Sequence, residues 1–113
     1  LNNNIIITEA LGYLEFLTAM RYAKLVITDS GGIQEETTYL GIQCVTVRDT
    51  TERPITVEIG TNTLAGTNLK NVNVIVNKII NNNEIKKGII PPLWDGKAAD
   101  RIVKIINDKI TII

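Results

Sequence analysis

Short runs of apolar, largely β-branched residues alternate along the chain with longer stretches of helical periodicity. The runs Ile5–Thr8, Leu25–Thr28 and Cys44–Val47 show no alternation of polar and apolar positions. Each of them is therefore predicted to be a buried strand, and Thr63–Ala65 is a weaker fourth candidate. Strands that are apolar on both faces are typical of parallel sheets covered on both sides. The pattern thus predicts an α/β fold with a doubly wound parallel sheet.

Between these runs, apolar residues recur at spacings of three and four. We expect helices at Tyr13–Ala23, Ile33–Leu40, Pro54–Ile59 and Leu69–Ile80, and a last one after Gly96. The second of these helices is expected to have Ile33, Thr37 and Leu40 on one face and to end at Gly41. In the last helix, Ala99, Ile102, Ile106 and Ile110 are expected to face inward, with Trp94 anchoring it. We expect a single domain, residues 1–113, in which residues 91–113 form a linker and a C-terminal helix.

Composition excludes several classes of function. Twelve basic and twelve acidic residues cancel, so no net field attracts nucleic acid or an anionic membrane. No apolar run reaches membrane-spanning length and no export signal opens the chain, which favours a cytoplasmic protein. The absence of histidine removes Ser-His-Asp triads and His-ligated zinc. Cys44 alone cannot form an internal disulfide and is expected to be a small buried hydrophobe.

The first residues indicate that part of the protein precedes them. The chain opens with Leu1 rather than Met and enters an apolar run almost at once. We therefore expect the sheet to be truncated at its N-terminus.

Ligands of doubly wound sheets bind beyond the carboxyl ends of the strands. Three loops that carry polar residues or glycine follow the predicted strands: Thr8–Leu11, Asp29–Gly32 and Arg48–Arg53. We expect these loops to converge on one edge of the sheet.

The segment Ser30-Gly31-Gly32 connects a strand to a helix within a few residues. The first turn of a helix has free N–H groups and the positive end of the dipole, and the Ser30 hydroxyl would add a donor, so phosphate or diphosphate could bind here. The alternative is that Ser30 merely caps the helix and the glycines merely form a tight turn. The short pattern alone favours that alternative.

Further candidates each have a structural alternative. Glu36 could accept hydrogen bonds from a ribose diol, although Glu35 and Glu36 could also simply stabilise the helix dipole. Arg53 could bind phosphate or a sugar hydroxyl, or form a local ion pair. Phe16 could stack on a base or belong to the core. Asp29, Glu35 and Glu36 lack the further oxygen ligands that a metal site needs, so we expect no metal.

Four blocks resemble, in order, the C-terminal portion of the non-hydrolysing UDP-N-acetylglucosamine 2-epimerases. They are LGYLEFL (residues 11–17), TDSGGIQEE (28–36), RDTTERP (48–54) and WDGKAA (94–99). The resemblance covers nearly the whole chain. It implies a GT-B architecture, with the nucleotide sugar held between two Rossmann-like halves of which this chain is part of the second.

The resemblance also implies a reaction. UDP-GlcNAc and UDP-ManNAc would be interconverted by elimination of UDP and its re-addition, without metal or cofactor, to supply surface polysaccharides. By position, Ser30, Gly31 and Gly32 would bind the diphosphate and Glu36 the ribose. Arg53 would contact the ligand, Phe16 would pack on uracil, and the backbone at Leu11 would meet the base.

The family's acid and base groups and its histidine lie N-terminal to this region. We therefore expect no catalytic residue in this chain, negligible activity of the chain alone, and a missing N-terminal domain as its partner. The full protein is expected to be a homodimer. Alternatives are a non-catalytic nucleotide-sugar-binding fragment that needs a partner chain, part of a hydrolysing epimerase, or part of a GT-B glycosyltransferase.

Overall fold

A three-stranded parallel sheet organises the chain, which the computed structural model describes over residues 3–111. The strands β1 (Leu25–Thr28), β2 (Gln43–Thr46) and β3 (Asn62–Leu64) lie side by side in that order. The predicted parallel sheet is confirmed, although β2 and β3 each begin one residue before the expected position. Val26 is paired with Cys44, and Cys44 in turn with Asn62. This register brings the ends of all three strands to one edge.

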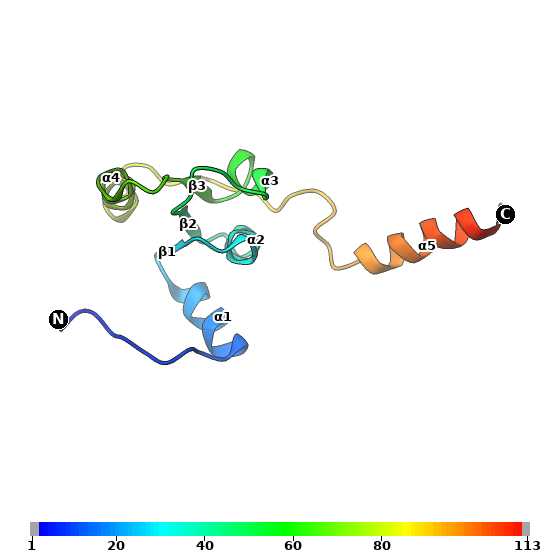
Figure 1. Ribbon diagram of the computed structural model, residues 1–113, viewed down its shortest axis with the longest axis horizontal. Coiled ribbons are helices and arrows are strands. Elements are labelled where there is room, and N and C mark those ends of the chain that lie inside the picture. The colour runs from blue at the N-terminus through cyan, green and yellow to red at the C-terminus, as the bar shows by residue number, and fades with distance from the viewer. Residues whose placement is uncertain (1–2, 112–113) are drawn as a thin grey trace.

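Helices cover both faces of the sheet, as the doubly wound pattern predicts. They are α1 (Tyr13–Tyr22), α2 (Gly31–Leu40), α3 (Pro54–Glu58), α4 (Leu69–Ile80) and α5 (Ala98–Thr111). Figure 1 shows α4 on one side of the sheet and α2 with α3 on the other. The left-handed backbone of Gly41 ends α2, with φ of 74°.

The two faces of the sheet are packed in different ways. Toward α4, Val45 and Ala65 form an apolar core with Val72 and Ile79. Toward α2 the buried side chains are polar, because Gln34, Thr37 and Thr38 face the sheet while Ile33 and Leu40 are only half-buried. Of Ile33, Thr37 and Leu40, which were expected to share one face of this helix, only Thr37 is buried. The Thr37 hydroxyl donates to the carbonyl of Ile33 at 2.8 Å, which satisfies it within the helix.

The predicted strand at Ile5–Thr8 does not form. These residues have no regular secondary structure, and the side chains of Ile6 and Ile7 are 84% and 74% exposed. A β-branched run favours a pleated backbone but cannot supply the neighbouring strand that completes a ladder. As a result the Thr8–Leu11 loop does not follow a strand, and only two of the three expected loops converge.

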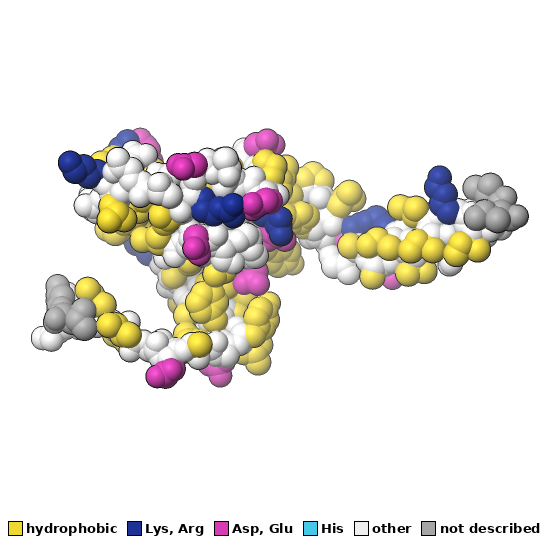
Figure 2. All heavy atoms as spheres, in the orientation of Figure 1, with side chains coloured by type: hydrophobic (Ala, Val, Ile, Leu, Met, Phe, Trp, Pro, Cys, Tyr) yellow, Lys and Arg dark blue, Asp and Glu magenta, His cyan; other side chains and the backbone are white. Residues whose placement is uncertain are grey.

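The last helix forms where it was expected but does not face inward. No residue of α5 is buried, and Ile102, Ile106 and Ile110 are more than half exposed. Figure 1 shows α5 extending away from the sheet, and Figure 2 shows a row of apolar side chains along it. The helix start is held by Arg101, which donates to the carboxylate of Asp95 and to the carbonyl of Leu93.

The segment after α4 returns across the end of α3 and the start of β3. The Lys86 ammonium donates to the carbonyls of Val57 and Asn62, and partial burial lowers its pKa. Gly88 crosses Gly60 so closely that a Cβ on Gly88 would lie 2.6 Å from the carbonyl carbon of Gly60. Glycine is therefore required at this crossing. Within residues 3–111, no helix combines the length and apolarity needed to cross a membrane.

Candidate functional site

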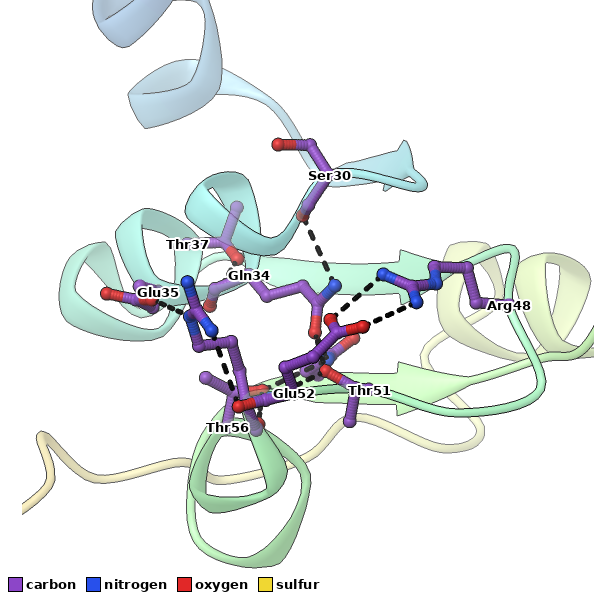
Figure 3. A network of polar contacts seen from close by, with 10 residues as sticks. Ser30, Gln34, Glu35, Thr37, Arg48, Thr51, Glu52 and Thr56 are labelled. Atoms are coloured by element: carbon purple, nitrogen blue, oxygen red, sulfur yellow. Dashed lines mark hydrogen bonds and ion pairs between the residues drawn. The ribbon is translucent and has the colours of Figure 1, made fainter.

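The junction between β1 and α2 leaves the first turn of the helix uncapped. Ser30 occupies the N-cap position, but its side chain makes no capping hydrogen bond. Its backbone N–H donates to the Thr28 hydroxyl at 3.0 Å, and in Figure 3 its own hydroxyl points away from the neighbouring polar network. The alternative that the Ser30 side chain caps the helix is therefore wrong. An exposed hydroxyl and the positive end of a helix lie together at this junction.

The fold does not require glycine at either of the first two positions of α2. Neither Gly31 nor Gly32 has a positive φ. A Cβ on Gly32 would meet nothing within 4 Å, and one on Gly31 would only come into ordinary contact with the guanidinium of Arg53. The tight-turn explanation therefore fails. Two residues without side chains keep the backbone amides open to close approach from outside.

Arg53 comes from the loop after β2 and lies over the start of α2. Its Nε donates to the carboxylate of Glu35 in α2, so Arg53 forms an ion pair, but with another element rather than within its own loop. The two side chains are 43% and 42% exposed, however, which leaves the guanidinium within reach of a ligand. The structure thus brings together Ser30, Gly31, Gly32 and Arg53.

The neighbouring arginine has a different role. Arg48 donates twice to the carboxylate of Glu52, at 3.0 and 2.7 Å. These hydrogen bonds lower the pKa of Glu52 and raise the pKa of Arg48. The pair fixes the loop that carries Arg53, which is the structural role expected of an Arg–Glu pair here.

Glu36 lies one helical turn beyond Gly32, on the same face of α2. It lines an open groove of about 400 Å³. The other residues that line the groove are Tyr13, Leu17, Glu35, Tyr39, Leu40 and Trp94. Because α2 begins at Gly31, neither glutamate is in the first turn, and dipole stabilisation explains them less well than expected.

Leu11 lies just before α1, and Phe16 lies in its first turn. Their side chains are 46% and 36% exposed, and neither lines the groove. The core alternative for Phe16 is therefore wrong.

Sequence reasoning missed a buried polar network beneath the site (Figure 3). Gln34 and Asn62 are fully buried, and the amide of Asn62 donates to the side-chain carbonyl of Gln34 at 3.0 Å. Thr51 and Thr56 connect this pair to the loop of Arg53. The sequence signal that could have indicated this network is the presence of a glutamine in α2 and an asparagine in β3 at positions that face the core.

The described residues contain no group of side chains suited to bind a metal ion, and their one cysteine is poorly suited to act as a nucleophile. Among residues 3–111, no three acidic or cysteine side chains cluster so as to hold a metal ion. Cys44 is buried, as predicted, and burial raises the pKa of its thiol, which makes it a poor nucleophile.

Comparison with known proteins decides the family. The profile described as UDP-N-acetylglucosamine 2-epimerase matches residues 1–107. The chain belongs to this family. It is 45% identical over 110 residues to the UDP-N-acetylglucosamine 2-epimerase of Methanocaldococcus jannaschii, and 37% identical over 113 residues to that of Escherichia coli K12. These matches cover 94% and 96% of the chain, but only 28% and 30% of the two relatives.

Solved epimerase structures share the α/β fold. The M. jannaschii UDP-GlcNAc 2-epimerase in complex with UDP-GlcNAc and UDP superimposes with a TM-score of 0.76 at 44% identity, over 94% of this chain and 28% of that one. S. aureus MnaA, in a co-structure with UDP, gives 0.81 at 32% identity, over 99% and 31% of the two chains. The predicted membership of the UDP-N-acetylglucosamine 2-epimerase family and the predicted fold class are thus confirmed. This chain spans less than a third of the relatives' length.

Proposed function

We propose that this chain provides the UDP-binding part of an epimerase that interconverts UDP-GlcNAc and UDP-ManNAc. The observation that carries the proposal is the uncapped start of α2, where the Ser30 hydroxyl and the Arg53 guanidinium flank two glycines. Backbone amides, a hydroxyl and a cation are the donors that a diphosphate requires. Binding of UDP by solved relatives supports the same assignment.

The site would act on the reaction as well as on binding. Elimination removes the proton at C2 of the sugar and breaks the bond between C1 and the β-phosphate oxygen, and UDP leaves with the electron pair. Negative charge develops on that oxygen in the transition state. Donors fixed at the start of α2 would stabilise this charge more than that of the ground state and so lower the barrier. UDP then re-adds to C1, and C2 receives a proton on the opposite face.

In this division of labour, Glu36 would bind the ribose, Phe16 would pack on uracil, and the backbone at Leu11 would meet the base. We place the groups that move the C2 proton in the remainder of an enzyme of the relatives' length. That enzyme would be a cytoplasmic homodimer.

Calorimetric titration with UDP tests the binding half of the proposal. The chain should bind UDP weakly and uridine more weakly still, because uridine lacks the diphosphate. Equal affinity for UDP and uridine would contradict the diphosphate site. UDP-GlcNAc should not be turned over by the chain alone, and formation of UDP-ManNAc would show that the proton-transferring groups are present in it.

A product assay with the complete enzyme separates the related activities. The proposal expects UDP-ManNAc in equilibrium with UDP-GlcNAc. Free ManNAc and UDP would instead identify a hydrolysing epimerase, and a product that requires an added acceptor would identify a glycosyltransferase.

A further inference from the structure

The backbone of Arg53 is held at both of its polar groups by threonine hydroxyls. Its N–H donates to Thr51 Oγ1 at 2.9 Å, and its carbonyl accepts from Thr56 Oγ1 at 2.7 Å. Arg53 precedes Pro54 and has φ of −122° and ψ of 57°, which is neither helical nor extended. Its conformation therefore depends on these two hydroxyls as well as on the proline.

Both hydroxyls lead back to the same buried pair of amides. Thr51 donates to Gln34 Oε1 at 2.5 Å, and Thr56 accepts from Asn62 Nδ2 at 3.0 Å. Asn62 also donates to Gln34 Oε1 and accepts from the Thr46 hydroxyl. These hydrogen bonds fix the orientation of the side-chain amides of both Gln34 and Asn62, because an amide nitrogen can only donate and an amide oxygen can only accept.

The same Gln34 reaches the other side of the site. Its Nε2 donates to the carbonyl of Ser30 at 3.2 Å. One buried side chain thus connects the residue before the first turn of α2 to the loop of Arg53. Ser30 and Arg53 are 23 positions apart in sequence, and the Arg53 guanidinium nevertheless lies over Gly31.

We propose that Gln34 and Asn62, acting through Thr51 and Thr56, are positioning residues that hold Arg53 at the start of α2. This inference rests on the proposed function for its purpose, but the geometry it describes exists without ligand. A network that only stabilised the fold would need no path to Arg53. Here both threonine branches end on that one residue.

Thr51→Val is the sharpest variant, because it keeps the side-chain shape and removes both hydrogen bonds of the hydroxyl. Thr51 is half-buried in a loop, so the substitution leaves the core intact. Thr51→Ser is the matched control, since it keeps the hydroxyl. The first measurement needs no ligand: hydrogen exchange of the Arg53 Nε–H by NMR, with Arg101, paired to Asp95, as internal reference.

Thr51→Val should speed the exchange of the Arg53 Nε–H by about three- to tenfold, the scale of one lost hydrogen bond. The Arg101 exchange rate should not change in this variant, and the Arg53 exchange rate should not change in Thr51→Ser. Unchanged exchange at Arg53 in a folded Thr51→Val chain would overturn the proposal. Equal acceleration at Arg101 would indicate general loosening and would overturn it as well.

A double-mutant cycle with UDP gives the second measurement. Thr51→Val should weaken UDP binding in the unchanged chain and have no further effect in an Arg53→Gln background, because Thr51 acts through Arg53. An equal loss in both backgrounds would contradict the positioning role. If neither the unchanged chain nor any variant binds UDP, the proposed function fails. The exchange measurement then still decides the positioning role.

Discussion

The guanidinium carbon of Arg53 lies 3.8 Å from the position that a Cβ of Gly31 would occupy. The two residues follow different strands, Gly31 after β1 and Arg53 after β2. Parallel strands place both loops at the same edge of the sheet, so a cation from one loop meets the first amides of the helix that begins in the other. The proposed diphosphate site is formed where these two loops lie side by side.

Replacement of Ser30 by alanine should weaken UDP binding and leave folding almost unchanged. The hydroxyl makes no capping hydrogen bond, so the usual cost of about 1 kcal/mol for removing a cap should not appear. A charge-assisted hydrogen bond to diphosphate should cost about 1–3 kcal/mol of binding free energy. Calorimetry with UDP and urea unfolding measure the two quantities. Unchanged UDP affinity would remove Ser30 from the site.

Two glycine-to-alanine substitutions should have opposite effects on the stability of the fold. Gly32→Ala should preserve or slightly raise stability, by up to about 1 kcal/mol, because alanine is the better helix former and its Cβ meets open space. It should nevertheless weaken UDP binding by crowding the approach to the amides. Gly88→Ala should lower the unfolding midpoint, since its Cβ would collide with the backbone of Gly60. Thermal unfolding and UDP titration of both variants check this. Normal UDP affinity in Gly32→Ala would argue against close approach there.

Conversion of Glu36 to glutamine should weaken UDP more than free pyrophosphate. A carboxylate accepts two hydrogen bonds from a ribose diol, and pyrophosphate has no ribose. Glu35→Gln is the informative comparison, because it releases Arg53 from its ion pair and should alter the affinity for both ligands. Competition titrations with the two ligands measure the ratio. An equal loss for UDP and pyrophosphate in Glu36→Gln would exclude a ribose role.

The pair Arg48–Glu52 should make the loop sensitive to acid. Hydrogen bonds from Arg48 lower the pKa of Glu52 in the folded chain. A lowered pKa stabilises the fold above the unfolded value of about 4.3, and this contribution is lost as the pH falls through the folded pKa. Both side chains reach solvent, so the effect on global stability should be small.

Carbon-detected NMR titration of the Glu52 carboxyl measures this directly. Arg48→Gln should return its midpoint toward the ordinary glutamate range, whereas Arg101→Gln should shift only Asp95, whose pKa Arg101 lowers. The same Glu52 midpoint with and without Arg48 would contradict the pairing.

Local patterns predicted most of the architecture. Apolar runs predicted β1 and β2, periodicity predicted α1 and α4, and Gly41 predicted the end of α2. These features depend on residues close in sequence. The run at Ile5–Thr8 has the same pattern as β1, three apolar residues followed by threonine, but it has no pairing partner within residues 3–111. The local pattern does not encode that difference.

The candidate site residues could be named from the sequence, but the hydrogen bonds that connect them could not. The resemblance to the family indicated Ser30, Gly31, Gly32, Glu36 and Arg53 as candidates, and the structure brings four of them to the start of α2, with Glu36 one turn away. The binding roles of these residues, like those of Leu11 and Phe16, remain predictions. The hydrogen bonds of Gln34 with Thr51 and Asn62 join three elements, and no single stretch of sequence contains them. Long-range polar contacts of this kind require the tertiary structure.

A crystal structure of the complete enzyme with UDP tests the central claim most directly. Our account predicts diphosphate oxygens within about 3 Å of the backbone nitrogens of Gly31 and Gly32, with the Ser30 hydroxyl and the Arg53 guanidinium on either side. A complex in which UDP is bound elsewhere, while the amides at the start of α2 face solvent, would contradict it.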